Sequence, residues 1–266
     1  MFSHNADAVR RIAAVAIASG LMAGASLLAP PAAAQGQQPR TEVAPFQHGV
    51  HAGAGGGPTA YDEATPPLFD NLGKHTWKVT TKNPEVQAFF DQGLRLAYGF
   101  NHAEARRAFR QAQRLDPSCA MCFWGEAFVL GPNINVPMAP AANTPALAAV
   151  ERARALAGNA SEKEQALISA LAKRYSADPK AERAQLDKAW SDALGEVAKR
   201  FPEDIELAVL HAEAMMDTQP WDYWADGGKR AKGQANEIVA ELERAMAKNP
   251  HHLGAIHLYI HAVEAS

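Results

Sequence analysis

Apolar and small residues recur at spacings of three and four along the chain from Pro84 onward. This spacing matches the period of an α-helix, which has about 3.6 residues per turn. Pro and Gly interrupt the pattern every few turns, and stretches of apolar and polar alternation long enough for a strand do not occur. The pattern therefore predicts an all-α fold built from successive helices.

One part of the pattern is also the signature of a repeat. An aromatic residue, a glycine and a large residue are followed by A-x3-F, an alanine and a closing proline, as in the tetratricopeptide consensus: Phe89, Gly93, Leu96, Ala105, Phe109, Ala112 and Pro117. The small residues let two helices approach, Phe109 fills the space between them, and Pro117 ends the second helix because it has no backbone donor. We therefore predict a tetratricopeptide-like α-α superhelix, a right-handed solenoid of helical hairpins.

Further helix boundaries are predicted later in the chain. The segments Arg200-Phe201-Pro202 and Lys248-Asn249-Pro250 end helices by the same proline argument. Ser161 and Glu164 have the spacing of a capping box, which opens a helix that runs to about Tyr175. These boundaries place further helix pairs after the first one.

The first 34 residues have the features of a secretory signal peptide. Arg10 and Arg11 precede an apolar stretch from Ile12 to Leu28, and Ala32-Ala33-Ala34 provides a cleavage site. A membrane anchor is the alternative, but small polar residues and glycines interrupt the apolar stretch. We predict a periplasmic or secreted protein with no membrane span after cleavage.

The rest of the chain divides into a linker and a repeat domain. Residues 35–67 are rich in Gly, Pro, Ala, Gln and Thr, which is typical of a flexible linker, and residues 68–266 form the predicted repeat domain. The net charge of -3, with both signs interspersed, provides no basic surface for nucleic acid. No G-x-S-x-G, P-loop or Rossmann pattern occurs in a fitting context, so the sequence favours a binding protein over an enzyme.

Four segments of the chain are long and specific: FDQGLRLAYGFNHAEA from Phe90, DPSCAMCFWGEAFVLGPNINVPM from Asp116, PWDYW from Pro220 and GAIHLYIHAVEAS from Gly254. They resemble segments of a family of exported bacterial tetratricopeptide-repeat proteins whose activity is largely unassigned. Members of this family continue into further helix pairs and a second histidine-containing segment. The resemblance implies that residues 68–266 are the N-terminal part of a longer repeat domain.

The last predicted helix has no second helix to cover its apolar side. It begins at about Leu253, runs to Ser266 and carries Ile256, Ile260 and Val263 on one stripe. An exposed stripe of this kind is typical of an interaction surface. Self-association through this helix is therefore one expectation.

Tetratricopeptide arrays bind ligands in a concave groove lined by the first helix of each pair. The repeat phase assigns these groove positions: Phe90, Leu94, Tyr98, Trp124, Phe128, Glu213 and Asp217. Trp221 and Trp224 lie in an insertion from Thr218, where a long loop can carry binding residues. We predict that a peptide or protein partner binds in this groove. The alternative is that these aromatic residues form the core.

The last helix also carries a candidate metal site. His257, His261 and Glu264 are four and then three residues apart, so they share one helix face and could bind one divalent ion such as zinc or copper. Glu213 and Asp217 could complete or orient this set. The alternative is that these histidines only form hydrogen bonds. His251 and His252 are expected to cap carbonyl groups or face solvent.

Cys119 and Cys122 form a C-x-x-C pair at the start of a predicted helix. The helix dipole favours a thiolate there, so redox chemistry or copper binding is one interpretation. A disulfide or simple packing is the other, because an exported protein meets an oxidising compartment.

Overall fold

The computed structural model describes residues 64–266, and the predicted signal peptide and most of the predicted linker lie outside them. The described part is mostly helical, with nine α-helices and a single pair of two-residue strands. The all-α prediction is therefore confirmed for residues 64–266. Within this range no helix is both long and apolar enough to cross a membrane.

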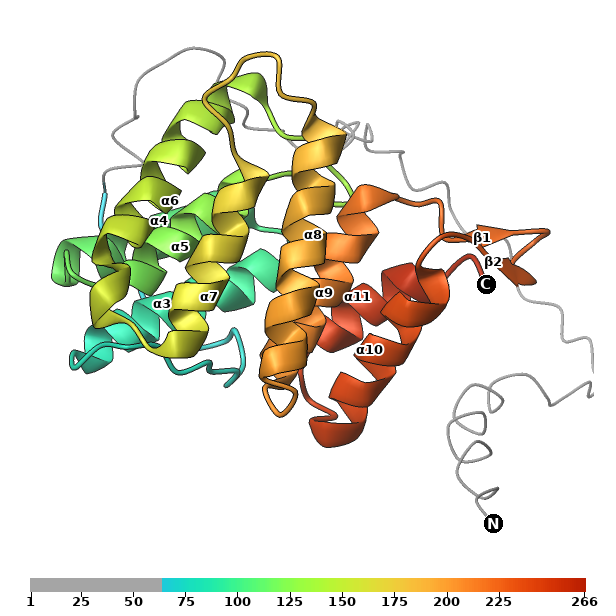
Figure 1. Cartoon of the computed structure of the whole chain (residues 1–266). Coiled ribbons are helices and arrows are strands. Elements are labelled where there is room, and N and C mark those ends of the chain that lie inside the picture. Colours follow the sequence, from blue (N-terminus) through green and yellow to red (C-terminus); the bar gives the residue numbers. More distant parts are fainter. Residues whose placement is uncertain (1–63) are drawn as a thin grey trace, which may run out of the picture. The chain divides into compact units, whose positions relative to one another are not determined.

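The helices follow one another along the chain (Figure 1). The first group consists of α3 (Pro84–Tyr98), α4 (His102–Leu115), α5 (Ala120–Leu130) and α6 (Asn143–Leu156). The second consists of α7 (Glu162–Leu171), α8 (Arg183–Arg200), α9 (Ile205–Thr218), α10 (Ala235–Lys248) and α11 (Leu253–Val263). Short 3-10 turns span Pro140–Ala142, Ala157–Asn159 and Ala172–Arg174.

Every helix from α3 to α11 contacts the next helix along the chain, and α7 to α10 lie side by side in Figure 1. In an open solenoid each repeat touches only its neighbours. Here α11 also contacts α3, although the two helices lie near opposite ends of the described chain. This contact brings the end of α3 against the histidines of α11.

Phe109 of α4 packs between two glycines. A Cβ atom added to Gly93 of α3 would lie 2.6 Å from the Phe109 ring, and one added to Gly125 of α5 would lie even closer. The ring therefore occupies the space that larger residues at these positions would fill. Packing of Phe109 between paired helices agrees with the sequence prediction.

The predicted helix ends agree closely with the structure. Helix α8 ends at Arg200 and α10 at Lys248, each two residues before a proline. Ser161 and Glu164 form the predicted capping box at the start of α7. The helix that follows ends earlier than expected, at Leu171, and continues as a 3-10 turn.

The insertion after α9 forms a small hairpin, in which β1 (Trp224–Ala225) pairs with β2 (Arg230–Ala231) in antiparallel register. Trp221 precedes this hairpin with a left-handed backbone, at φ 62°, and its side chain is 49% exposed. The indole nitrogen of Trp224 donates to the carbonyl oxygen of Ala262 at 2.6 Å. The hairpin is thus attached to the end of α11.

Residues 64–83 form no helix or strand and lie along α3. The backbone nitrogen of Trp77 donates to Asp91 Oδ1 at 3.1 Å, and Arg95 Nε donates to the carbonyl oxygen of His75 at 2.6 Å. These contacts fix the segment and direct His75 toward the interior, where it meets α9 and α11.

Candidate functional site

The residues predicted to line a concave groove are mostly buried. Those on α3 and α5 belong to the hydrophobic core: Phe90, Leu94, Tyr98, Trp124 and Phe128. Trp124 stacks on Phe128 with ring centroids 5.1 Å apart. The alternative that these aromatic residues form the core agrees with this packing. Because these side chains are already covered by the rest of the protein, they do not support peptide binding in the groove.

The two groove carboxylates on α9 are also inside the protein. Asp217 Oδ2 accepts a hydrogen bond from Arg174 Nη2 at 2.7 Å, and the same guanidinium donates to Asp187 at 3.0 Å. Burial raises the pKa of both Glu213 and Asp217, and the charge of Arg174 opposes that shift. Asp217 therefore serves as the partner of a buried arginine.

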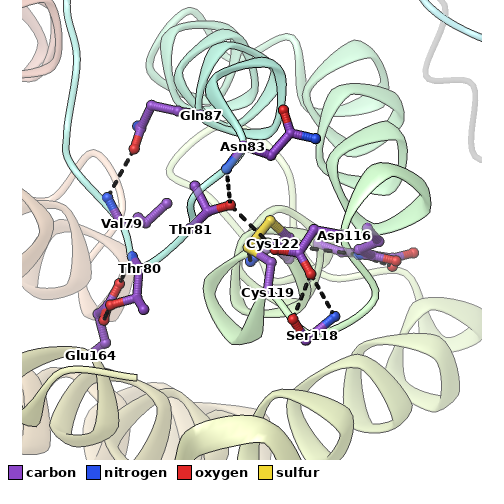
Figure 2. The surroundings of a disulfide bond; sticks show 12 residues. Val79, Thr80, Thr81, Asn83, Gln87, Asp116, Ser118, Cys119, Cys122 and Glu164 are labelled. Atoms are coloured by element: carbon purple, nitrogen blue, oxygen red, sulfur yellow. Dashed lines mark hydrogen bonds between the residues drawn. A yellow bond between two sulfur atoms is a disulfide. The ribbon is translucent and has the colours of Figure 1, made fainter. Parts of the chain in front are cut away.

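The two cysteines form a disulfide bond at the start of α5 (Figure 2). Both side chains are buried. Above the bond, Thr81 Oγ1 donates to Asp116 Oδ2 at 3.2 Å, and Asp116 also accepts from Ser118. With both sulfur atoms bonded to each other, the pair has no thiolate for copper, and the disulfide interpretation agrees with the structure.

A group of polar side chains that the sequence did not bring together lies where residues 64–83, α9 and α11 meet. Glu206 Oε2 is 3.0 Å from His75 Nε2 and 3.2 Å from His252 Nε2. The other carboxylate oxygen, Oε1, accepts a hydrogen bond from the Tyr98 hydroxyl. Within residues 64–266, this is the only set of three or more His, Cys, Asp or Glu side chains whose ligand atoms all lie within 4.8 Å of one another.

The hydrogen-bond directions in this group disfavour a metal ion. His252 is the N-cap of α11, and its Nδ1 accepts from the backbone nitrogen of Ala255 at 3.2 Å. A neutral imidazole that accepts at Nδ1 carries its proton on Nε2. His252 Nε2 therefore donates to Glu206, and it has no lone pair for a metal unless the ring becomes an imidazolate.

The carboxylate of Glu206 is ionised in this environment. Burial alone would raise its pKa, but the hydrogen bond from His252 and the contact with His75 outweigh that effect and lower the pKa to about 2. In turn, burial and the neighbouring Glu206 raise the pKa of Tyr98 well above its ordinary value. The group is thus an anion surrounded by donors, which we name the Glu206 network: His75, Tyr98, Glu206 and His252.

His75 is the least satisfied member of the Glu206 network. Its Nε2 atom is buried 3.0 Å from Glu206 Oε2 but lacks the alignment of a hydrogen bond. Its ring packs against that of His252 with centroids 4.5 Å apart.

The predicted metal residues on α11 form a second group, which is partly exposed. His257 Nε2 and His261 Nε2 face each other 3.1 Å apart. Glu264 lies on the opposite side of the His261 ring, with Oε1 3.1 Å from Nδ1. The structure therefore brings the two imidazoles together but not all three predicted ligands, and Glu264 contacts the nitrogen that faces away from His257. Glu213 and Asp217 do not join them in a three-ligand group.

The hydrogen-bond directions in this pair are opposite to those in the Glu206 network. His257 Nδ1 is 2.5 Å from the carbonyl oxygen of Tyr98, which can only accept, so Nδ1 carries the proton. The Glu264 carboxylate likewise accepts from His261 Nδ1. Each neutral ring therefore has its lone pair on Nε2, and the two lone pairs point toward the same place. We name these two residues the histidine pair.

Two aromatic rings enclose the histidine pair. The Phe100 ring centroid lies 4.6 Å from that of His257 and 5.7 Å from that of His261, and Trp221 meets His261 edge-on at 5.3 Å. Phe100 and Trp221 both have positive φ, at 55° and 62°. A bulky residue in this conformation is uncommon, and such backbone strain clusters at functional sites.

Sequence reasoning missed the roles of both histidines in the Glu206 network. His252 was expected to cap carbonyl groups or face solvent, but it is fully buried and caps the amino end of α11. Its position just before a helix, after Pro250, was the available signal. His75 lies in a segment without any period, so only the fold brings it to Glu206.

No family model, no curated protein and no solved structure matches this chain. The candidate sites therefore depend on their own geometry.

Proposed function

We propose that this protein binds a divalent transition metal ion, zinc or copper, through the histidine pair. The observation that carries the proposal is that Nε2 of His257 and Nε2 of His261 lie 3.1 Å apart while an acceptor occupies each Nδ1. Two lone pairs at this distance repel each other unless a positive charge lies between them. That charge is either a proton on one ring or a metal ion.

The distance also fits two ligands of one ion. Two nitrogen atoms that bind a tetrahedral zinc ion at about 2.0–2.1 Å are about 3.3 Å apart. Imidazole nitrogen suits zinc and copper alike, so the donors do not choose between the two metals. Metal-bound histidines usually donate their other N–H to a carbonyl or carboxylate, which are the roles of Tyr98 and Glu264 here.

Two protein ligands leave coordination positions for other groups. The His261 side chain is 20% exposed, so solvent or an external ligand can reach the ion. A structural zinc site has four protein ligands, whereas an open site exchanges its remaining ligands. The proposed site is therefore one for metal transfer or for presenting a metal to another molecule.

The exported tetratricopeptide-like array remains part of the proposal. Contacts between successive helices and the packing of Phe109 between glycines support helical-hairpin stacking. The disulfide between Cys119 and Cys122 is consistent with an oxidising compartment such as the periplasm. Peptide binding remains a weaker proposal, because among the predicted groove residues only Trp221 is largely exposed.

Copper titration of the chelator-treated protein tests the proposal. Cu²⁺ quenches nearby tryptophans, and the Trp221 ring lies 5.3 Å from that of His261. We expect saturable quenching in the wild type and in His251→Ala, an exposed histidine near the same helix. The double variant His257→Ala, His261→Ala should lose it. Trp221→Phe should reduce the signal but keep the binding, as measured by calorimetry, because Trp224 also lies at the end of α11. Equal binding by wild type and double variant, or no binding by either, would overturn the proposal.

A further inference from the structure

Tyr98 connects the two histidine groups. Its hydroxyl donates to Glu206 Oε1, and its backbone carbonyl accepts from His257 Nδ1 at 2.5 Å. The side chain is buried, and α11 packs directly on its ring, since a Cβ atom on Gly254 would lie 2.6 Å from the ring. The Tyr98 ring and the carbonyl that orients His257 are therefore held in one place.

Glu206 reaches the same helix by a second route. Its Oε2 atom accepts from His252 Nε2 at 3.2 Å, and His252 caps α11 through its other ring nitrogen. His257 lies on this helix, just over one turn after the cap. Glu206 thus holds both the end of α3, through Tyr98, and the start of α11, through His252.

We propose that Glu206 is the positioning residue of the metal site and aligns His257 through these two arms, Tyr98 and His252. The inference rests on the proposed function, because it assigns no separate ligand to Glu206. Both arms lead to the position of His257 Nε2, and neither touches His261. Loss of Glu206 should therefore disturb one ligand of the pair.

Residues that orient a metal ligand typically change metal affinity by roughly 10–100-fold when they are replaced. Glu206 acts one step further away, so we expect an effect of about tenfold, at the lower end of that range. The ionised state of the carboxylate supports this role, because only a carboxylate accepts from both donors at once.

Two substitutions separate the arms. In Glu206→Gln the side-chain oxygen can still accept from Tyr98, but the amide nitrogen faces the N–H of His252, so the second arm is lost. In Tyr98→Phe the first arm is lost while the carbonyl that accepts from His257 remains. Glu213→Gln is the matched control, because it makes the same substitution at another buried carboxyl group on the same face of α9, one whose pKa burial raises to about 8.

The experiment measures Zn²⁺ affinity by calorimetry and the Cu²⁺ electron paramagnetic resonance spectrum for the full chain and each variant. We expect Glu206→Gln and Tyr98→Phe each to weaken Zn²⁺ binding, by about tenfold for Glu206→Gln. Both should alter the copper spectrum, which reports ligand geometry rather than stability. Glu213→Gln should retain the wild-type affinity and spectrum. If Glu206→Gln does not fold, Tyr98→Phe alone decides.

Three outcomes would overturn the inference. Wild-type affinity and spectrum in the folded variants would show that Glu206 positions nothing. An equal loss in Glu213→Gln would indicate a general effect of any substitution on α9. A fall from two bound ions to one in Glu206→Gln would make Glu206 a ligand instead. Failure of the wild type to bind metal would be a different result, because it removes the proposed function itself.

Discussion

The Glu206 network and the histidine pair contain the same kind of side chain in opposite hydrogen-bonding states. In the network, His252 accepts with Nδ1 and donates with Nε2 to a carboxylate. In the pair, His257 and His261 both have an acceptor at Nδ1, so their Nε2 lone pairs face each other. Proximity alone favours the network as a metal site, since it has three candidate ligands. The hydrogen-bond directions favour the pair.

The difference shows that a cluster of metal-binding residue types is not by itself a metal site. A neutral histidine binds an ion only through a nitrogen without a proton, and the partner of the other nitrogen decides which one that is. A buried carboxylate that already has donors is satisfied without an ion. The following predictions test this contrast, beginning with the largest expected effect.

Removal of the anion should destabilise the protein strongly. Glu206→Ala leaves the Tyr98 hydroxyl and the His252 N–H buried without an acceptor, and each unsatisfied donor costs about 1–3 kcal/mol. Urea unfolding measures the change in free energy. Glu264→Ala, at an exposed position, should change the free energy of unfolding by less than about 0.5 kcal/mol. A similar loss of unfolding free energy in both variants would contradict the difference between the Glu206 network and the histidine pair.

Acid should weaken the Glu206 network before it unfolds the rest of the protein. The folded pKa of Glu206 is lowered to about 2, so its contribution is complete above the unfolded value of about 4.3 and is lost as the pH falls through the folded value. The total contribution is about 3 kcal/mol, and about 2 kcal/mol of it is lost between about pH 4 and pH 2. Unfolding curves of wild type and Glu206→Gln across this range should converge toward low pH. Parallel curves would contradict an ionised, hydrogen-bonded carboxylate.

Metal should stabilise the protein through the pair and not through the network. A ligand at a hundred times its dissociation constant adds about 2.7 kcal/mol to the free energy of unfolding. We expect Zn²⁺ to raise the melting temperature of wild type and of His75→Ala, but not of His261→Ala. If Zn²⁺ raised the melting temperature of His261→Ala but not of His75→Ala, the metal site would lie in the Glu206 network instead.

The disulfide should contribute to the stability of the protein but not to metal binding. A bond that closes so short a loop contributes about 2 kcal/mol in the chain-entropy model. The double variant Cys119→Ser, Cys122→Ser should therefore melt at a lower temperature and bind as much metal per chain as the wild type. If this variant bound less copper than the wild type, the cysteines would take part in copper binding after all.

The parts of the fold that depend on local sequence could be predicted. The period of three and four, the prolines after Arg200 and Lys248 and the capping box at Ser161 are all features of neighbouring residues, and each helix boundary follows from them. The packing of Phe109 between helices could also be predicted, because Gly93 and Phe109 have the spacing of the tetratricopeptide consensus, whereas its second partner, Gly125, was not predicted.

The histidine pair could be predicted only in part, and the reason is physical. Spacing on a helix places His257 and His261 on one face, but it does not say which ring nitrogen meets Glu264. The contact between α11 and α3, which joins the pair to Tyr98, depends on how all the helices between them pack together. No local pattern in the sequence reports this long-range packing, and the groove assignment was limited for the same reason.

Direct observation of the histidine protons tests the contrast between the two groups most directly. A long-range proton–nitrogen correlation spectrum distinguishes protonated Nδ1 from protonated Nε2 for each imidazole, before and after addition of Zn²⁺. We predict a proton on Nδ1 in His257 and His261, a proton on Nε2 in His252, and zinc-induced shifts of Nε2 only in the pair. Protonated Nε2 in both His257 and His261, or zinc-induced shifts in His75 and His252 instead, would contradict the account.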